Sequence, residues 1–291
     1  MRRFLGIDLA WAEGTAARPA RETGLACIDE HGRVLALETA RGIDEVVAWV
    51  ARWDGPGAVA AVDGPLVVAN ATGSRLAEKE VASRYGRLGI SAYPSNRGLP
   101  AQGAVALRRR LEDAGWRYDD GSPADHDADA RTMLECYPYT TLVGAPELGF
   151  DGMKPRYKRL APLLPTAERR PARAAEFRVV LDRIAGLAQA DPPLDVTTHP
   201  AAAALVADGP AILERQHKHL EDLLDGLICA WTAAYWARHG TARSQVLGAT
   251  DPVVDELGRR GTIIAPARPH QRAPHDPLHA PAPVPAPAPT A

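Results

Sequence analysis

The first 66 residues contain apolar runs of strand length, separated by short polar breaks, in an order that few folds accommodate. Three such runs come first, at residues 2–10, 23–29 and 33–40. The break at residues 30–32 (Glu-His-Gly) is typical of a turn between antiparallel strands. Residues 42–53 place valines and an isoleucine on one helical face, and residues 58–66 (AVAAVDGPL) form a fourth, continuously apolar run. The predicted order is strand, strand, strand, helix, strand.

The fourth run defines the centre of the predicted sheet. A strand without polar alternation is buried on both faces, and a strand reached through a helix pairs in parallel with an earlier one. We therefore expect residues 58–66 to lie beside residues 2–10. These two strands carry Asp8 and Asp63 near their ends, so strand pairing brings the two acids together at the centre of one sheet. A charge among apolar neighbours is costly unless it is paired or binds a cation.

The rest of the chain predicts helices and one hairpin around this sheet. Helices are expected at residues 73–86, opened by Ser74, within 96–116, at 172–189 and at 216–240. Residues 117–130 are polar and rich in Asp and Gly, which predicts a surface loop. The stretch RTMLECYPYT contains a short strand that carries Glu135. A small hairpin is expected between Ala242 and Pro266, with GTIIAP as its second strand.

Composition separates a folded part of the chain from a tail. The 291 residues are 46% hydrophobic, which is enough for a substantial core. Residues 266–291 hold nine of the 26 prolines and almost no large apolar side chains, so we expect them to form a disordered tail. The folded domain is predicted at residues 1–265, with helical and loop insertions around 70–130 and 145–215. The net charge of -2 produces no global field toward nucleic acid or lipid.

Cysteine usage bears on the compartment. Cys27, Cys136 and Cys229 lie far apart without metal-ligand spacing, which argues against disulfides and structural zinc and favours small buried side chains. The first apolar run is interrupted by Asp8 and Glu13, so it is not expected to be a signal peptide. No stretch reaches the length of a membrane span. These features predict a cytoplasmic protein without a membrane partner, and they leave the oligomeric state open.

Asp222 and Asp225 form a second acidic pair. They are three residues apart and therefore adjacent on one face of the predicted helix 216–240. Like charges this close repel, unless a cation or a proton relieves the repulsion. Hard divalent ions take carboxylate oxygens as ligands, and two such ions about 4 Å apart activate a water and stabilise the leaving oxygen of a phosphodiester. Acids on central strands together with an acidic helix face suit that chemistry.

The order of these motifs resembles a known superfamily. FLGIDLAW, the three-strand opening, AVAAVDGPL, LECYP and LEDLLDGLICAWTA follow one another as in the RNase H-like superfamily. More narrowly, the chain is similar to its RuvC-like branch and to the bacterial family of predicted nucleases called domain of unknown function 429. RuvC-like resolvases carry a D-x-x-D-A-L-A type motif on the final helix, and DLLDGLICA at 222–230 matches it with Gly226 in place of alanine. The match covers roughly residues 3–265, with YPSNRG and ECYP as its landmarks in the middle third.

The resemblance implies a fold and a set of roles. The fold is α/β, an RNase H-like mixed five-stranded sheet with three antiparallel strands and then parallel strands, flanked by helices. The implied activity is hydrolysis of nucleic-acid phosphodiester bonds with two bound Mg²⁺ or Mn²⁺ ions. The implied metal ligands and catalytic acids are Asp8, Asp63, Asp222 and Asp225. Glu135 is either a fifth catalytic acid or a packing element.

A basic segment offers contacts for a polyanionic substrate. Between residues 152 and 178 there are eight basic residues and two glutamates, an excess of six positive charges. Beside the acids this segment would bind phosphates, whereas a solvated helix and loop explain it nearly as well. The candidate substrate contacts are Lys154, Arg156, Lys158 and Arg75. Arg75 and Glu78 are also spaced for an exposed helical ion pair. The sequence does not choose between DNA and RNA.

Two other functions and one structural alternative remain open, and a histidine metal site is not expected. An actin-like sugar kinase or ATPase shares this sheet, but DLAWAEG offers a single glycine where a phosphate-binding loop is needed. A non-catalytic module that binds nucleic acid or protein would keep the fold without the reaction. Asp222 is also spaced to be a helix-surface acid paired with Lys218. His217 and His219 lie on different helical faces, which argues against a histidine metal site.

Overall fold

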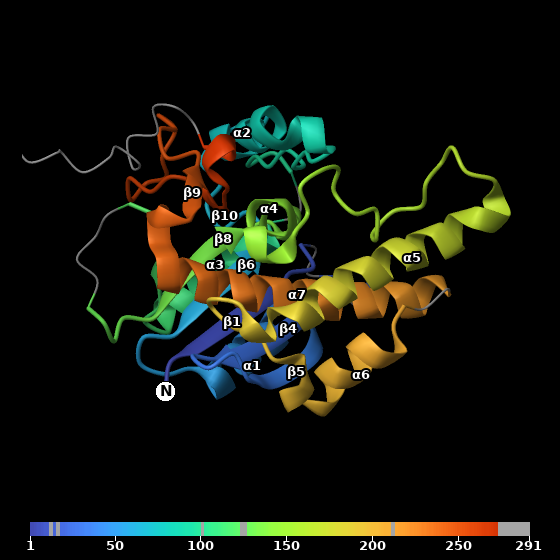
Figure 1. Cartoon of the computed structure of the whole chain (residues 1–291). Coiled ribbons are helices and arrows are strands. Elements are labelled where there is room, and N and C mark those ends of the chain that lie inside the picture. The colour runs from blue at the N-terminus through green and yellow to red at the C-terminus, as the bar shows by residue number, and fades with distance from the viewer. Residues whose placement is uncertain (12–13, 16–17, 100–101, 123–126, 211–212, 273–291) are drawn as a thin grey trace, which may run out of the picture.

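The computed structural model describes residues 1–11, 14–15, 18–99, 102–122, 127–210 and 213–272 (Figure 1). Residues 273–291, most of the predicted tail, lie outside the described residues. The beginning of that predicted tail is folded. Strand β10 (Ile263–Pro266) runs into it, and the side chain of Gln271 is buried in a short 3-10 helix (Pro269–Gln271). The predicted boundary at residue 265 is therefore too early.

Six strands form the central sheet of the described part of the chain. In spatial order they are β5 (Val34–Arg41), β4 (Glu22–Asp29), β1 (Arg3–Asp8), β6 (Val59–Asp63), β8 (Thr132–Cys136) and β7 (Arg117–Tyr118). β5, β4 and β1 pair antiparallel, and β6, β8 and β7 continue in parallel with β1. The predicted mixed sheet and the parallel pairing of the first and fourth runs are confirmed.

The predicted count of five strands is one too few. The sixth strand, β7, lies at the start of the segment 117–130 that was expected to be a surface loop, and it pairs in parallel with β8. Its two residues are too few to show the alternation by which a strand is recognised. The hairpin predicted near the end of the domain is confirmed, because β9 (Ser244–Leu247) pairs antiparallel with β10. A further short pair joins β2 (Gly14–Thr15) to β3 (Arg18–Pro19).

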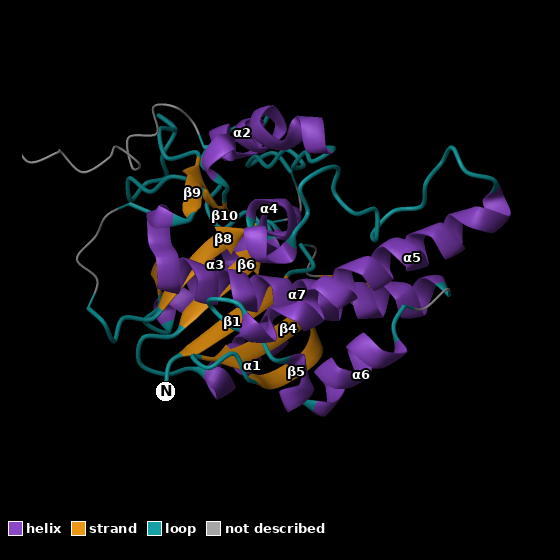
Figure 2. Cartoon of the chain, in the orientation of Figure 1, coloured by secondary structure: helices purple, strands orange, loops and turns teal. Residues whose placement is uncertain are grey.

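Helices cover both faces of the sheet (Figure 2). On one face, α1 (Ile43–Trp53) and α3 (Gly103–Asp113) bury the apolar side chains of the odd-numbered positions of β1. On the other, α7 (Glu214–His239) crosses β1 and β4 (Figure 1). The same side holds α2 (Leu76–Tyr85), α4 (Pro138–Gly144), α5 (Thr166–Ala185) and α6 (Pro200–Asp208).

All five predicted helices are present, with shifted ends, and α4 and α6 were not predicted. The second helix begins at Leu76, with Arg75 rather than Ser74 as its capping residue. The helix predicted at 172–189 begins earlier, at Thr166, and its first turns project from the body of the molecule at the right of Figure 1. The division of the chain into one domain with two insertions stays a prediction.

Three glycines allow α7 to lie directly on the sheet. A Cβ atom added at Gly6 of β1 would lie 2.0 Å from the carbonyl oxygen of Gly226, and one added at Gly24 of β4 would lie 1.7 Å from that of Asp222. A Cβ atom at Gly226 would lie 3.0 Å from the backbone of Gly24. The glycine that replaces alanine in the helix motif thus permits a close crossing. The crossing carries Asp222 and Asp225 to the strand ends.

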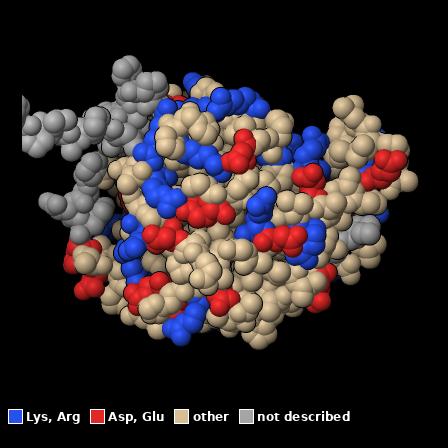
Figure 3. Space-filling model, in the orientation of Figure 1, with Lys and Arg blue, Asp and Glu red and all other residues tan. Residues whose placement is uncertain are grey.

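The surface charge, the cysteines and the apolar character of the helices can be compared with the sequence predictions. Basic and acidic side chains are interspersed on the face shown in Figure 3. Cys27, Cys136 and Cys229 are unpaired and buried, as predicted. None of the described helices combines the length and the apolar character needed to cross a bilayer.

Candidate functional site

Two aspartates end neighbouring parallel strands and face the same side of the sheet. Asp8 closes β1, Asp63 closes β6, and the two residues are direct partners in the strand register. Side chains alternate between the faces of a strand, so Asp8 shares the face of Gly6, on which α7 packs. The charge of Asp63 acts on Asp8 and raises its pKa. The meeting of the two acids follows from the pairing predicted for their strands.

Helix α7 adds two more aspartates to this pair. Asp222 is buried, and its charge acts on Asp8. Asp225 is fully buried, and its charge acts on both Asp8 and Asp63. The four aspartates predicted as metal ligands therefore meet at one place. The expectation of Asp222 as a helix-surface acid is wrong, because the side chain is buried.

Two lysines and a tyrosine contact the helix aspartates. Lys158 forms an ion pair with Asp225, and Tyr157 donates a hydrogen bond of 2.6 Å to the Oδ1 atom of the same carboxylate. Lys218 pairs with Asp222 at 2.7 Å, the spacing that the sequence predicted. Lys218 also pairs with Glu221 at 2.8 Å. Five carboxyl groups thus stand against two ammonium groups.

The surplus of carboxyl groups shifts their protonation. Burial, followed by the charge of Asp225, holds the pKa of Asp8 well above its ordinary value. Burial also raises the pKa of Asp63 to about 6 and raises the pKa of Asp222. A raised pKa means that the metal-free site takes up protons more readily, and a bound cation would displace them.

The chemistry of the donor set fits a hard divalent cation. Such ions take oxygen ligands from carboxylates, and the negative surplus would be offset by their charge. In the described part of the chain, no three acidic, histidine or cysteine side chains are already arranged to enclose a metal ion. The ammonium groups of Lys158 and Lys218 lie on the helix aspartates instead. The residues that would hold Mg²⁺ or Mn²⁺ are Asp8, Asp63, Asp222 and Asp225.

The structure does not bring Glu135 into the aspartate cluster. In the β6–β8 register the partner of Asp63 is Cys136, and Glu135 lies beside Val62, whose side chain packs on the α1 face. A shift of one residue along a strand reverses the face to which a side chain points. Glu135 instead makes a bidentate pair with Arg75 at 2.6 and 2.8 Å. Its role is therefore in the wall of the site.

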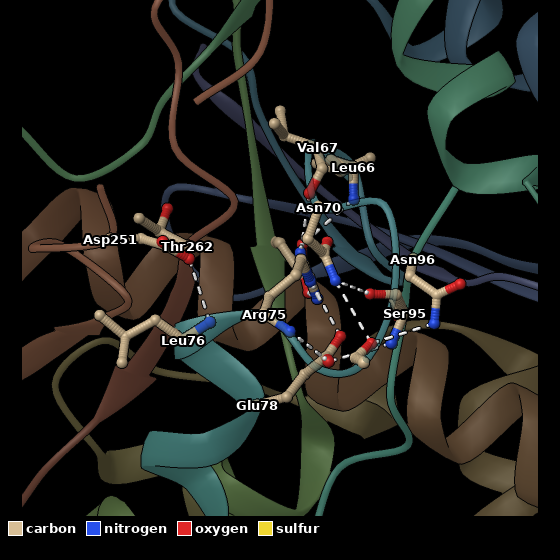
Figure 4. Close-up of polar contacts among 12 residues, drawn as sticks. Leu66, Val67, Asn70, Arg75, Leu76, Glu78, Ser95, Asn96, Asp251 and Thr262 are labelled. Atoms are coloured by element: carbon tan, nitrogen blue, oxygen red, sulfur yellow. Dashed lines mark hydrogen bonds and ion pairs between the residues drawn. The ribbon is translucent and has the colours of Figure 1, made fainter. Parts of the chain in front are cut away.

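Arg75 is also bound by Glu78, so its guanidinium group has no free edge. The predicted Arg75–Glu78 ion pair is present at 2.8 Å, but it is buried rather than exposed, with Arg75 4% accessible. The carboxylate of Glu78 accepts a further hydrogen bond from the backbone of Ser95, and Asn70 donates to the Ser95 carbonyl (Figure 4). This network joins the loop after β6 to the YPSNRG segment. It positions a loop and leaves no free contact to a substrate.

A cavity of about 380 Å³ opens over the acids. Its lining includes Asp8 and Asp63 on one side and Tyr93, Tyr137, Tyr139, Lys154, Lys158 and Arg159 on another. Lys154 lies 4.2 Å from the centroid of the Tyr139 ring. Three of the predicted substrate contacts, Lys154, Lys158 and Arg75, therefore line the cavity, although Glu78 and Glu135 already bind the Arg75 guanidinium group. Arg156 does not line this cavity but a second one between the basic segment and α5.

A comparison with protein-family models matches residues 6–250 to a family described as a protein of unknown function, DUF429. The chain belongs to this family. The matched region includes all four aspartates of the cluster. Comparisons with curated proteins and with solved structures found no match.

Several residues at the site of this DUF429 protein escaped the sequence analysis. Tyr157 was not singled out, although it precedes Lys158 in the basic segment, because no local pattern shows that this loop folds back onto α7. Glu221 carried a visible signal, its i, i+3 spacing from Lys218 on an acidic helix face. Tyr93 and Arg159 come from segments 66 residues apart, so only the fold brings them together.

Proposed function

We propose that this DUF429 protein is a divalent-metal-dependent nuclease that hydrolyses phosphodiester bonds of nucleic acid, with a fold of the RNase H-like superfamily and its RuvC-like branch. The observation that carries the proposal is the cluster of Asp8, Asp63, Asp222 and Asp225 beside a cavity with basic and aromatic side chains. The strand order, three antiparallel strands followed by parallel ones, supports the assignment of the fold.

In the proposed reaction the residues at the site would bind the metal ions, orient a ligand of the metal and contact the phosphate group. Bound Mg²⁺ or Mn²⁺ would activate a water and stabilise the leaving oxygen. The charges of Asp63 and Asp222 both act on Asp8, so its carboxylate would be the central ligand of a bound cation. Tyr157 holds the orientation of Asp225 through its hydrogen bond. Lys154 lines the same cavity and offers a charge to the phosphate group.

The proposal extends to the cellular setting. Unpaired, buried cysteines are typical of a reducing compartment, so we place the activity in the cytoplasm. The loop after β1, where a kinase would need its phosphate-binding glycines, includes residues 12–13 and 16–17, which lie outside the described residues. The structure of this loop therefore does not distinguish a kinase or a non-catalytic module from a nuclease, and the experiment below does.

The direct test is cleavage of labelled DNA and RNA by the purified protein with Mg²⁺, Mn²⁺ or EDTA. We expect cleavage with metal and none in EDTA. Asp8→Asn is expected to lower the rate by at least about 100-fold, since metal-ion catalysis contributes several kcal/mol. Asp44→Asn, at an exposed position on α1, is the matched control and is expected to keep the wild-type rate.

The outcomes separate the candidate functions. Equal cleavage by Asp8→Asn and wild-type protein would exclude the aspartate cluster as the catalytic site. ATP-dependent phosphorylation of a sugar, without nucleic-acid cleavage, would identify the kinase. Binding of nucleic acid without metal binding or cleavage would identify the non-catalytic module.

A further inference from the structure

The cavity over the acids has a buried end and an exposed end of different chemistry. Asp8 and Asp63 are half-buried, whereas Tyr93 is 64% exposed and Arg159 is exposed. All four line the same cavity. A ligand entering the cavity from solvent therefore contacts an aromatic ring and a cation first and the carboxylates last.

The exposed end carries a ring and a cation arranged for stacking. The Arg159 guanidinium lies 5.6 Å from the centroid of the Tyr93 ring and donates a hydrogen bond to the Tyr93 hydroxyl. Proteins bind unpaired bases by stacking them on aromatic rings and by tracking the phosphates with basic side chains. Lys154, on the same cavity, adds a second cation near the aspartates.

A buried hydroxyl in the cavity wall lacks a hydrogen-bond partner. Ser95 is 4% exposed and lines the cavity, and its Oγ atom makes no hydrogen bond with any described residue. Its backbone is held on both sides, by Glu78 and by Asn70 (Figure 4). Buried polar atoms are rarely left unsatisfied, so an unpaired hydroxyl in the wall of a cavity indicates a polar ligand.

The size of the cavity limits what enters. A volume of about 380 Å³ falls at the small end of the ~300–1,000 Å³ range of small-molecule sites, which suits one nucleotide and not a pair of stacked strands. From these observations we infer that the substrate is single-stranded nucleic acid. One unpaired nucleotide occupies the cavity, its base stacks on Tyr93, and its phosphate contacts Arg159 and Lys154, with Ser95 bound to the sugar or phosphate. This inference rests on the proposed nuclease function.

Binding in EDTA tests the inference without any cleavage. Fluorescence anisotropy is measured with labelled eight-nucleotide single strands, oligo-dT and oligo-U, and with the same sequences paired in blunt duplexes. At least one single strand is expected to bind at least about tenfold tighter than its duplex. Tyr93→Ala is expected to weaken single-strand binding about tenfold, and Tyr93→Phe to restore it. Ser95→Ala is expected to weaken it severalfold with an unchanged melting temperature.

A matched charge control completes the design. Arg159→Ala is expected to lower single-strand affinity and to reduce the slope of log affinity against log salt by about 0.7, the value for one phosphate contact on a single strand. Arg52→Ala removes an equally exposed charge from α1, on the opposite side of the sheet, and is expected to change neither. Duplex binding as tight as single-strand binding, or a Tyr93→Ala variant that binds like Arg52→Ala, would overturn the inference.

The two proposals fail in different ways. Single-strand binding that depends on Tyr93 but is followed by no cleavage in Mg²⁺ or Mn²⁺ would refute the nuclease and keep the single-strand site. Metal-dependent cleavage that is lost in Asp8→Asn, together with a duplex preference, would keep the nuclease and refute the single-strand site.

Discussion

Replacing Asp63 by asparagine is expected to make the metal-free protein more stable at neutral pH. Burial raises the pKa of Asp63 from 3.8 to about 6, so the folded state binds more protons than the unfolded state between these values. Stability falls with rising pH wherever the folded state binds more protons. The cost of the ionised carboxylate is therefore absent near pH 4, develops up to about pH 6 and is fully present at pH 8.

The magnitude follows from the size of the shift. A change of about two pKa units corresponds to about 3 kcal/mol at ~1.4 kcal/mol per unit. Asp63 is half-buried, and solvent screening lowers this to about 1–2 kcal/mol. Asparagine has nearly the same shape and no charge, so Asp63→Asn is expected to raise the free energy of unfolding by that amount at pH 8 and to leave it nearly unchanged at pH 4.

Urea denaturation in EDTA at pH 4 and pH 8 measures both values. Asp44→Asn is the control, because this carboxylate is 87% exposed and its substitution is expected to change the free energy of unfolding by less than about 0.5 kcal/mol. Destabilisation of Asp63→Asn at pH 8, or the same change at both pH values, would refute the reasoning. A stabilised but inactive variant would show that the site gives up stability for function.

Three further predictions concern the cation, the buried network and the helix crossing. Mn²⁺ affinity, measured by calorimetry, is expected to fall as the pH drops through about 6, where Asp63 takes up its proton, and a constant affinity from pH 8 to pH 5 would contradict this. Arg75→Met leaves two buried carboxylates unpaired and is expected to destabilise the fold by about 3–5 kcal/mol in urea denaturation, whereas the exposed Arg52→Met is expected to change it by less than about 0.5 kcal/mol. Gly24→Ala places a Cβ atom 1.7 Å from the α7 backbone and is expected to weaken Mn²⁺ binding at least about tenfold, because the helix has to move. Gly55→Ala is the control, since the space around Gly55 is open. Equal effects of the two substitutions on Mn²⁺ affinity would contradict the role of the crossing.

The centre of the fold and most of the site were predictable because they depend on local periodicity. The strands that carry Asp8 and Asp63 show continuous apolar character, and their parallel pairing follows from the intervening helix. The spacing of Asp222 and Asp225 places both on one face of a helix without any knowledge of the fold. These inferences needed only the order of the elements along the chain and the side-chain periodicities of strands and helices.

The parts that were missed depend on register and on long-range contacts. Glu135 is one residue out of step with Asp63, and no sequence pattern reveals which of two adjacent strand positions faces α7. The burial of Arg75 depends on Glu135, 60 residues away, so its spacing to Glu78 alone indicated an exposed pair. Lys158 reaches Asp225 because a loop folds back across 67 residues, a contact that a basic segment does not specify.

The binding of Mn²⁺ to crystals of the protein tests directly whether the four aspartates form a cation site. Crystals are soaked in millimolar Mn²⁺, and anomalous diffraction locates the ion. We expect an anomalous peak for an ion bound by the carboxylate of Asp8 and by at least one of Asp63, Asp222 and Asp225. No such peak is expected in crystals of Asp8→Asn. Well-diffracting wild-type crystals without a peak among the four aspartates, or with manganese only elsewhere, would contradict it.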